Sequence, residues 1–388
     1  MDTSIDLSIL PCEVRQYIWS YCDKPSLKVL SVCCKQMYAE VKPFVWKRVE
    51  VSWQFLQGIT KELVKNPHPN LQLISCLVLG AENRSAWQPS RKVRGSFWLL
   101  TLLERCEQLK SLTMCNFLPT DGPRLVSEIL PQLQNLELKN IKLRDGDLKP
   151  LVGLLELKSL TLDHCSIKKS DWNVIWQLES LEHLTLTHAS PLDSEDLIPG
   201  GGFCLKNLRS FKFSGESREL YSCIATISVK LVSLDLTWSG IQDSDILNLS
   251  CLKGLKYLSL FGADEITDLG ISHLTNLTCL EQLTLGDCEL LSPQCLLDIG
   301  KIQTLTSLDL FNCPEETTDI SCLSNLQNLH ALNISGMPGL TDDALKVAAQ
   351  LKHLRKLMIR CYDPDDNKFT EEGIRHLYSA STSQNGGR

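Results

Sequence analysis

The sequence predicts an α/β fold: a solenoid with parallel strands on its concave face and helices outside, preceded by a small all-α head. Two observations support this prediction. An apolar pattern recurs through most of the 388 residues at a nearly constant spacing. The first 46 residues lack this pattern and show apolar side chains at helical spacing. We therefore divide the chain into a head at 1–46, a repeat array at 47–378 with a degenerate first repeat, and a tail at 379–388 that we expect to be disordered.

The repeated pattern is Leu-x-x-Leu-x-Leu, with Ile, Phe or Met allowed at the apolar positions. Its twelve copies begin at Ile74, Leu109, Leu133, Leu157, Leu181, Leu208, Leu231, Leu255, Leu280, Leu305, Leu329 and Leu354. After a first gap of 35 residues, consecutive copies are 23 to 27 residues apart. A pattern and period of this kind are the signature of leucine-rich repeats, in which each repeat buries its apolar face against its neighbours.

Each copy of the pattern predicts one strand, whose alternate side chains point inward because the side-chain period of a strand is two. The rest of each repeat holds a loop and usually a helix, so every connection is a crossover and the strands pair in parallel. Several of these connections carry aspartate just ahead of an apolar run, at residues 242–246, 267–271 and 341–345, with a variant at 370–374. Short polar side chains at these places are expected to cap helix starts.

Composition restricts the class of protein. The net charge of -7 argues against nucleic acid as a main partner, because phosphate binding relies on a basic surface. No apolar run is long enough for a transmembrane helix, and the N-terminus does not resemble a secretory signal. None of the 17 cysteines has Cys-x-x-Cys spacing. We therefore expect a cytoplasmic or nuclear protein with reduced thiols, no metal site, no cofactor and no membrane contact.

Four cysteines follow a strand of the repeat: Cys165, Cys288, Cys313 and Cys361. A small apolar side chain fits the place where a strand turns into a loop, and no base for a catalytic thiol can be located in the sequence. We interpret these cysteines as structural and expect no catalytic residue. Together with the aspartates at the helix starts, they make the array resemble the cysteine-containing leucine-rich repeats of the F-box/LRR family.

Within the head, four stretches stand in a distinctive order: Leu10-Pro11-Cys12-Glu13, residues 18–23, residues 27–35 and Trp46. This arrangement resembles an F-box, a small helical domain. The resemblance implies binding to the Skp adaptor through residues at the matching positions, which are Leu10, Pro11, Glu13, Ile18, Leu27, Leu30 and Val32. Residues 46–51 also fit the repeat pattern, so the head is expected to lead directly into a first strand. The alternative is a helical cap that only shields the edge of that strand.

On the concave face, the exposed positions lie around each Leu-x-Leu, and most of them are small. Larger or acidic residues gather in the later repeats, and we name them as candidates for binding a protein substrate: Asp235, Trp238, Tyr257, Phe261, Asp309 and Phe311. Aromatic anchors of this kind are common hot spots of interfaces. Two alternatives stay open: the aromatic residues pack against loops, or the contacts come from the segment near Gly200 or the basic insertion at 82–95.

The F-box/LRR resemblance implies the substrate-receptor subunit of a multi-subunit ubiquitin ligase, in which the Skp adaptor joins the head to a cullin–RING complex. In this interpretation the chain is not an enzyme; it holds a protein substrate near the transferring subunits. A second hypothesis is a ubiquitin-independent interaction scaffold. A third, a ligase with its own cysteine nucleophile, is not favoured because the repeats extend almost to the end of the sequence.

Overall fold

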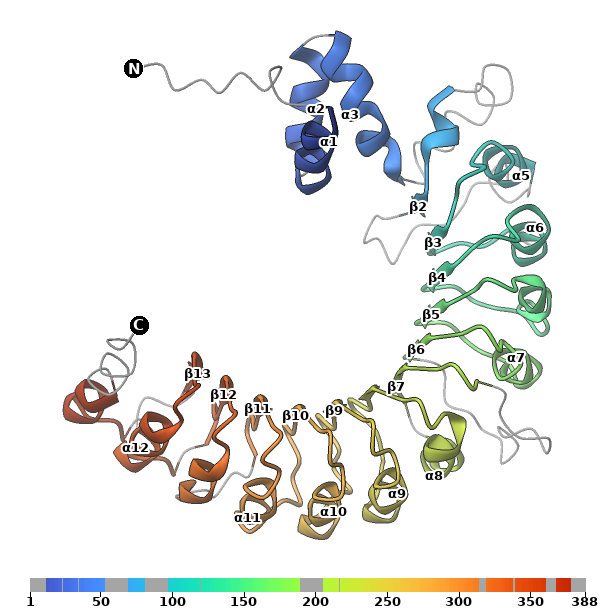
Figure 1. Ribbon diagram of the computed structural model, residues 1–388. Coiled ribbons are helices and arrows are strands. Elements are labelled where there is room, and N and C mark those ends of the chain that lie inside the picture. The colour runs from blue at the N-terminus through green and yellow to red at the C-terminus, as the bar shows by residue number, and fades with distance from the viewer. Residues whose placement is uncertain are drawn as a thin grey trace, which may run out of the picture. The chain divides into compact units, whose positions relative to one another are not determined.

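The computed structural model describes residues 12–22, 24–33, 35–52, 69–80, 97–119, 121–188, 205–215, 217–313, 319–337, 339–360 and 368–377. In this part of the chain, thirteen strands form one sheet in strict sequence order, β1 to β13 (Figure 1). Strands β1 to β4 pair in parallel, and so do strands β6 to β13. The predicted leucine-rich-repeat solenoid is confirmed. None of the described helices is long and apolar enough to cross a bilayer.

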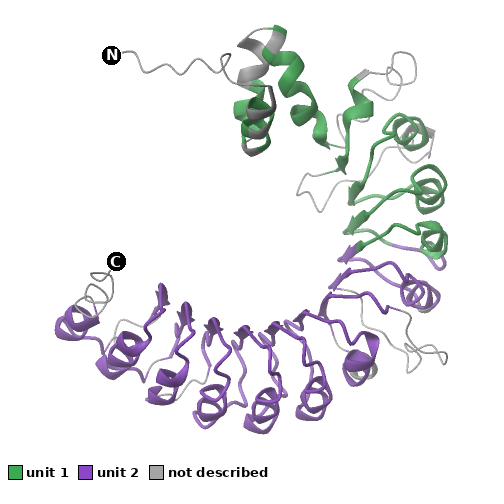
Figure 2. Cartoon of the chain, in the orientation of Figure 1, with its two compact units in different colours: residues 1–142, 147–159 green, residues 143–146, 160–388 purple. Residues whose placement is uncertain are grey.

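The chain forms two compact units (Figure 2): residues 1–142 with 147–159, and residues 143–146 with 160–388. The first unit contains α1 (Cys12–Tyr21), α2 (Lys24–Cys33), α3 (Lys35–Lys47), β1 (Arg48–Val51), η2 (Pro69–Leu73), β2 (Cys76–Leu79), α5 (Phe97–Leu103), β3 (Ser111–Cys115), α6 (Gly122–Ile129), β4 (Asn135–Lys139) and η3 (Lys149–Gly153).

Strand β5 (Ser159–Asp163) begins with the last residue of the first unit and continues in the second. The second unit then contains α7 (Lys169–Ile175), β6 (His183–Thr187), β7 (Ser210–Ser214), α8 (Arg218–Ile227), β8 (Ser233–Asp235), α9 (Asp243–Leu249), β9 (Tyr257–Ser259), α10 (Asp268–Leu274), β10 (Gln282–Thr284), α11 (Cys295–Ile299), β11 (Ser307–Asp309), η4 (Ser321–Asn325), β12 (Ala331–Asn333), α12 (Asp342–Gln350) and β13 (Lys356–Met358).

The three helices of the head enclose a small core of Trp19, Leu27 and Val41. Arg15 on α1 and Glu40 on α3 form an ion pair, with 2.6 Å between Nη2 and Oε1, and both side chains are largely buried. Helix α3 ends at Lys47 and β1 begins at the next residue, so no linker separates the head from the first strand. The helical character predicted for the head is therefore observed.

The repeat leucines form the core because the strands pair without offset. For example, Leu283 lies opposite Leu308, which lies opposite Leu332, and each of these side chains is 1% exposed. The side chains between them point to the other face of the sheet. Within each unit, the helices from α5 onward lie on one side of the strands (Figures 1 and 2). None of these described helices covers the opposite face of the sheet, which we call the strand face.

A residue with left-handed backbone follows many of the strands. The non-glycine residues with positive φ, between 49° and 66°, are Asn116, Asn140, His164, His188, Trp238, Asp287 and Asn312. In this region a side chain approaches the backbone closely, and Asn, Asp and His are the side chains that tolerate it best. Trp238 is the exception in this set. The repeated use of this conformation turns the chain from the strand towards the helix side at the same place in successive repeats.

The predicted helix caps are confirmed at two of the aspartate-containing stretches. The Thr267 hydroxyl accepts a hydrogen bond from the amide of Leu269 at 3.2 Å, and the Thr341 hydroxyl accepts one from the amide of Asp343 at 3.4 Å. At residues 242–246, the Asp245 carboxylate accepts a bond from the Gln242 amide at 3.0 Å. These contacts satisfy amides that have no partner inside the helix.

Aspartates at the helix starts also bind the next repeat, which the sequence analysis did not predict. The Asp243 carboxylate accepts hydrogen bonds from the Thr267 amide at 2.9 Å and the Thr267 hydroxyl at 2.6 Å. Asp268 accepts equivalent bonds from Ser292, and Asp342 accepts them from the Thr370 amide at 2.8 Å and hydroxyl at 2.5 Å. We call these contacts the cap ladder. It ties the start of α9 to that of α10, the start of α10 to Ser292 before α11, and the start of α12 to Thr370.

At two of its three contacts the cap ladder requires space in the following helix. A Cβ atom added at Gly270 would lie 2.4 Å from Oδ1 of Asp243, and one added at Gly373 would lie 2.3 Å from Oδ1 of Asp342. The side chain of Asp243 cannot move aside without breaking its two bonds to Thr267. Glycine is present at these positions because the carboxylate of the preceding repeat occupies the place of a side chain.

This close approach predicts that Gly270→Ala destabilises the protein. Alanine in place of glycine within a helix is ordinarily favourable by ~0.5–1 kcal/mol. Here we expect a loss of about 1–3 kcal/mol, because the new methyl group displaces Asp243 from Thr267. The measurement is the midpoint of urea unfolding followed by circular dichroism.

The control is the same substitution in an Asp243→Ala background. Asp243→Ala removes the carboxylate that the methyl group would meet. In this background Gly270→Ala should therefore lower the free energy of unfolding much less. An equal cost in both backgrounds would contradict the steric explanation.

Candidate functional site

Two of the residues predicted to bind an adaptor have described side chains, Ile18 and Leu27. Ile18 is half-buried and packs against the core of the head. Leu27 is 5% exposed and belongs to that core, so it supports the head from inside and offers little surface to a partner. The side chains of the others are not described: Leu10, Pro11, Glu13, Leu30 and Val32. Leu10 and Pro11 directly precede α1, and the other three lie on α1 and α2.

The two candidate aspartates lie in one row of the strand face. The strand register places Asp235 beside Ser259, Ser259 beside Thr284, and Thr284 beside Asp309. Asp235 and Asp309 are therefore separated by two strands, β9 and β10. Tyr257 lies in the parallel row that also contains Ser233, at the start of β9.

Each aspartate already has donors within the chain. Lys212 on β7 donates to Asp235 with 2.6 Å between Nζ and Oδ2, and the amide of Thr237 donates to Oδ1 at 3.1 Å. Oδ1 of Asp309 accepts from the Phe311 amide at 3.1 Å and from the Asn333 side chain at 2.8 Å. Burial raises the pKa of the Asp309 carboxyl, although these two hydrogen bonds act in the opposite direction. The aspartates therefore hold the turns that follow β8 and β11.

The candidate aromatic residues meet in those turns rather than on the strands. The rings of Trp238 and Phe261 are 5.3 Å apart and nearly perpendicular, and those of Phe261 and Phe311 are 6.0 Å apart and closer to parallel. Both arrangements are favourable for aromatic pairs. Trp238 is 57% exposed, whereas Phe261 and Phe311 are half-buried. We call these three residues the aromatic row. Tyr257 lies at the opposite end of β9 and is not part of it.

Two glycines make the aromatic row possible, and the sequence analysis missed them. A Cβ atom at Gly262 would lie 2.2 Å from the Trp238 ring, and one at Gly286 would lie 2.5 Å from the Phe261 ring. Phe311 belongs to the second repeat after that of Phe261, and Gly286 stands in the repeat between them. Phe261 reaches Phe311 because Gly286 has no side chain in the way. The aromatic rings thus pack over turn backbone and still leave Trp238 open to solvent.

The described cysteines are free thiols. Three of the four that follow strands have described surroundings, and Cys165, Cys288 and Cys313 are buried. The Cys288 thiol donates to the carbonyl of Leu260 at 3.3 Å, which fits the structural role predicted for these residues. Burial raises the pKa of the Cys106 thiol to about 12 and also raises that of Cys295. Thiols of this kind stay protonated and unreactive at neutral pH. Cys361 lies outside the described residues.

Other predictions made from the sequence also lie outside the described residues. They are the basic insertion at 82–95, the segment near Gly200 and the tail at 379–388.

One parallel strand per repeat, backed by a helix or a 3-10 turn, defines a leucine-rich-repeat solenoid. The solved structure of an internalin from Listeria monocytogenes has a similar fold, with a TM-score of 0.51 over 81% of this chain and 93% of that chain, at 21% sequence identity. No protein-family model matches the chain. The F-box/LRR-repeat protein 4 of Bos taurus is 29% identical over 162 residues, which are 38% of this chain and 25% of that protein. The chain therefore spans about a quarter of the length of this relative.

Burial of the thiols predicts selective alkylation. Brief treatment of the native protein with iodoacetamide should label Cys251 and Cys279, which are the exposed residues among the described cysteines. Mass spectrometry should find the buried cysteines protected until urea is added, namely Cys106, Cys165, Cys288, Cys295 and Cys313. Rapid labelling of this second group in the native state, or disulfides among them, would show that they are not buried, reduced structural residues.

Proposed function

We propose that this chain is the substrate-recognition subunit of a ubiquitin ligase of the Skp–cullin–F-box type. The observation that supports this most is a three-helix head that runs, without a linker, into the first strand of a leucine-rich-repeat sheet. The similarity to F-box/LRR-repeat protein 4 supports the same combination of modules. In this proposal the head binds the Skp adaptor, which joins it to a cullin–RING complex in the cytoplasm or nucleus.

The junction between head and strand suits this role because it fixes their orientation. The Lys24 side chain of α2 donates to the carbonyl of Arg48 in β1 at 3.0 Å. The amide and hydroxyl of Ser75, next to β2, both donate to the carbonyl of Lys47 at 3.0 and 3.2 Å. A receptor that holds its substrate in a fixed position raises the effective concentration of the reacting groups. The chain itself would supply no catalytic group.

For the substrate we propose the aromatic row and its neighbours on the strand face, Asp235, Tyr257 and Asp309. Trp238 offers exposed apolar surface, Phe261 packs edge-on against it, and Phe311 stacks on Phe261. Aromatic side chains of this kind dominate binding energy when a partner removes them from water. Because both aspartates have internal donors, we assign recognition mainly to the aromatic rings and to the hydroxyl of Tyr257.

The contacts between head and sheet also favour a second function. The hydrogen bond from Lys24 and the packing of α3 against β1 cover the first strand of the sheet. An exposed edge strand invites pairing with other chains, so a covering head has a purpose without any adaptor. The alternative function is therefore a ubiquitin-independent interaction scaffold. Adaptor binding distinguishes the two functions.

The first test replaces Leu10 and Pro11 together by alanine. This removes roughly one large apolar contact, worth ~1.5–3 kcal/mol, and the proline that precedes α1. We expect the affinity for purified Skp adaptor to fall at least tenfold, measured by calorimetry with the full chain.

The matched control is Leu155→Ala, which truncates a leucine that is 80% exposed elsewhere in the same unit. Its adaptor affinity and unfolding midpoint should be unchanged. If the unmodified chain does not bind the adaptor, the scaffold function is the correct one.

The second test replaces Phe261 and Phe311 together by alanine. Loss of two central aromatic side chains is expected to weaken substrate binding by about 2 kcal/mol or more, roughly 30-fold. The measurement is quantitative proximity labelling in cells, comparing the proteins that the chain enriches, with adaptor binding measured in parallel. Adaptor binding should not change.

Leu269→Ala with Leu297→Ala serves as the control, because these exposed leucines lie on α10 and α11, on the helix side of neighbouring repeats. Its set of enriched proteins should match the unmodified chain. Retention of every enriched protein by the phenylalanine variant would place substrate recognition elsewhere in the chain.

A further inference from the structure

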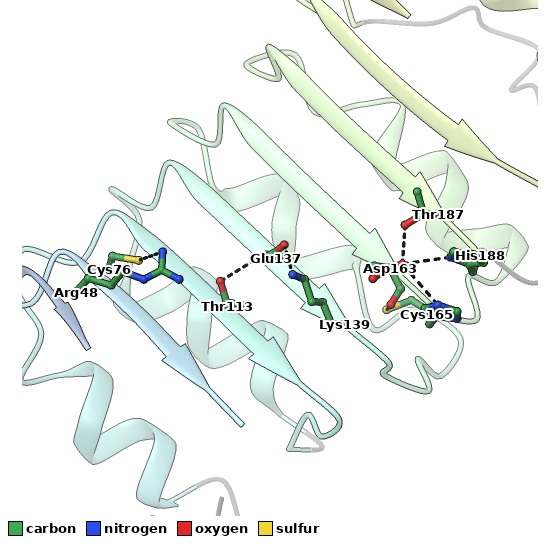
Figure 3. Close-up of polar contacts among 10 residues, drawn as sticks. Arg48, Cys76, Thr113, Glu137, Lys139, Asp163, Cys165, Thr187 and His188 are labelled. Atoms are coloured by element: carbon green, nitrogen blue, oxygen red, sulfur yellow. Dashed lines mark hydrogen bonds and ion pairs between the residues drawn. The ribbon is translucent and has the colours of Figure 1, made fainter. Parts of the chain in front are cut away.

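Two histidines and an aspartate converge at the end of β5 and β6. His164 and His188 occupy the same position in successive repeats, each directly after its strand and each with φ of 50°. Their rings are 3.9 Å apart between centroids and are inclined by only 3°. Asp163 is the last residue of β5. In Figure 3 the side chains of His188 and Thr187 both point towards Asp163.

The nitrogen and oxygen atoms of these side chains lie within reach of one ion. Nδ1 of His188 is 3.4 Å from Oδ1 of Asp163, and Nε2 of His164 is 4.0 Å from the same oxygen. One ligand atom from each of the three residues lies within 4.8 Å of the others. Ligands of a tetrahedral zinc ion, with bonds of about 2.0–2.1 Å, stand about 3.3 Å apart. The first of these distances already matches, and the distance from His164 to the same oxygen is longer by roughly 0.7 Å.

From this geometry we propose that Asp163, His164 and His188 form a binding site for a divalent transition metal ion, with Zn²⁺ as the expected occupant. Two imidazoles and one carboxylate are a donor set that suits zinc and its neighbours, rather than Mg²⁺ or Ca²⁺, which prefer oxygen ligands. The site is independent of the function proposed above. Three protein ligands leave further coordination positions for water or for a side chain of a partner.

The backbone holds the ligands in place before any ion arrives. The amide of His164 donates to the carbonyl of Thr187 at 2.9 Å, and the amide of His188 donates to the hydroxyl of Ser214 at 3.1 Å. The two turns are thus tied to the following repeats. The His164 and His188 side chains are 57% and 60% exposed, so their rings are free to rotate from the stacked arrangement until their lone pairs converge. Binding therefore requires side-chain rotation alone.

The carboxylate is oriented by a neighbour that is not a ligand. The Thr187 hydroxyl donates to Oδ1 of Asp163 at 2.6 Å. Residues that orient metal ligands in this way commonly affect affinity about 10- to 100-fold. Thr187 is accordingly a positioning residue of the proposed site.

A second histidine pair in the same unit provides a matched control. His330 and His353 also stack in successive repeats, with 5.9 Å between centroids and 16° between planes. Among the described residues, the group of Asp163, His164 and His188 is the one in which three potential ligands meet. His330 and His353 therefore share the ring chemistry but lack the third ligand.

The test titrates Zn²⁺ into the reduced, chelator-treated full chain by calorimetry. Asparagine replaces each histidine, because the equivalent Asn116 and Asn140 adopt the same left-handed backbone without strain. We expect His164→Asn, His188→Asn and Asp163→Asn each to lower the affinity at least tenfold, and Thr187→Val to lower it about tenfold. The double variant His330→Asn with His353→Asn should bind as the unmodified chain does.

Exposed cysteines could also bind zinc, so Co²⁺ serves as a second probe. Cobalt held by nitrogen and oxygen ligands shows visible absorption without the ultraviolet charge-transfer band of a thiolate, and this is the spectrum expected. Unfolding midpoints in urea confirm that each variant is folded. Absence of saturable binding overturns the proposal. A thiolate charge-transfer band that keeps its intensity in the His188→Asn variant also overturns it. Weakening by only one of the two histidine variants also overturns it, because the site requires both rings.

Discussion

The parallel pairing of each strand with its sequence neighbours is the constraint on which the other features of this protein depend. Leu258, Leu283, Leu308 and Leu332 follow one another across four strands without any offset. Because the register is kept, side chains at the same place in the repeat form rows. The buried leucines, the left-handed residues after the strands, the cap ladder and the aromatic row are all such rows, each at a different position in the repeat.

Periodicity made the fold predictable, because the features that repeat are set by local sequence. The apolar pattern that starts at Leu157 or Leu305 indicated a strand each time, and the threonines before α10 and α12 indicated helix caps. Contacts between repeats could not be predicted in the same way. The bond from Thr267 to Asp243 depends on which way a short side chain points, and on the room that Gly270 leaves. Neither is recorded in the pattern of apolar residues.

The sequence identified the residues of the candidate substrate surface, but it did not predict how they are grouped. The sequence placed Tyr257 and Phe261 in one group, whereas in the structure they lie at opposite ends of β9. It treated Asp235 as available to a partner, but Lys212, one repeat earlier, already neutralises it. The pair of His164 and His188 was missed for a related reason. Metal-ligand motifs in a sequence are recognised by short spacings, whereas His164 and His188 are one full repeat apart.

The cap ladder has a consequence for how such an array can grow. In the cap ladder a repeat offers a hydroxyl to the repeat before it and a carboxylate to the repeat after it, and at Gly270 and Gly373 it also leaves room for the incoming carboxylate. The repeat of α10 supplies all three through Thr267, Gly270 and Asp268. Tandem copies of this repeat would therefore fit against one another. A gene duplication there would lengthen the array without a compensating substitution, whereas copying a repeat that lacks the hydroxyl would leave the carboxylate of the preceding repeat without that partner.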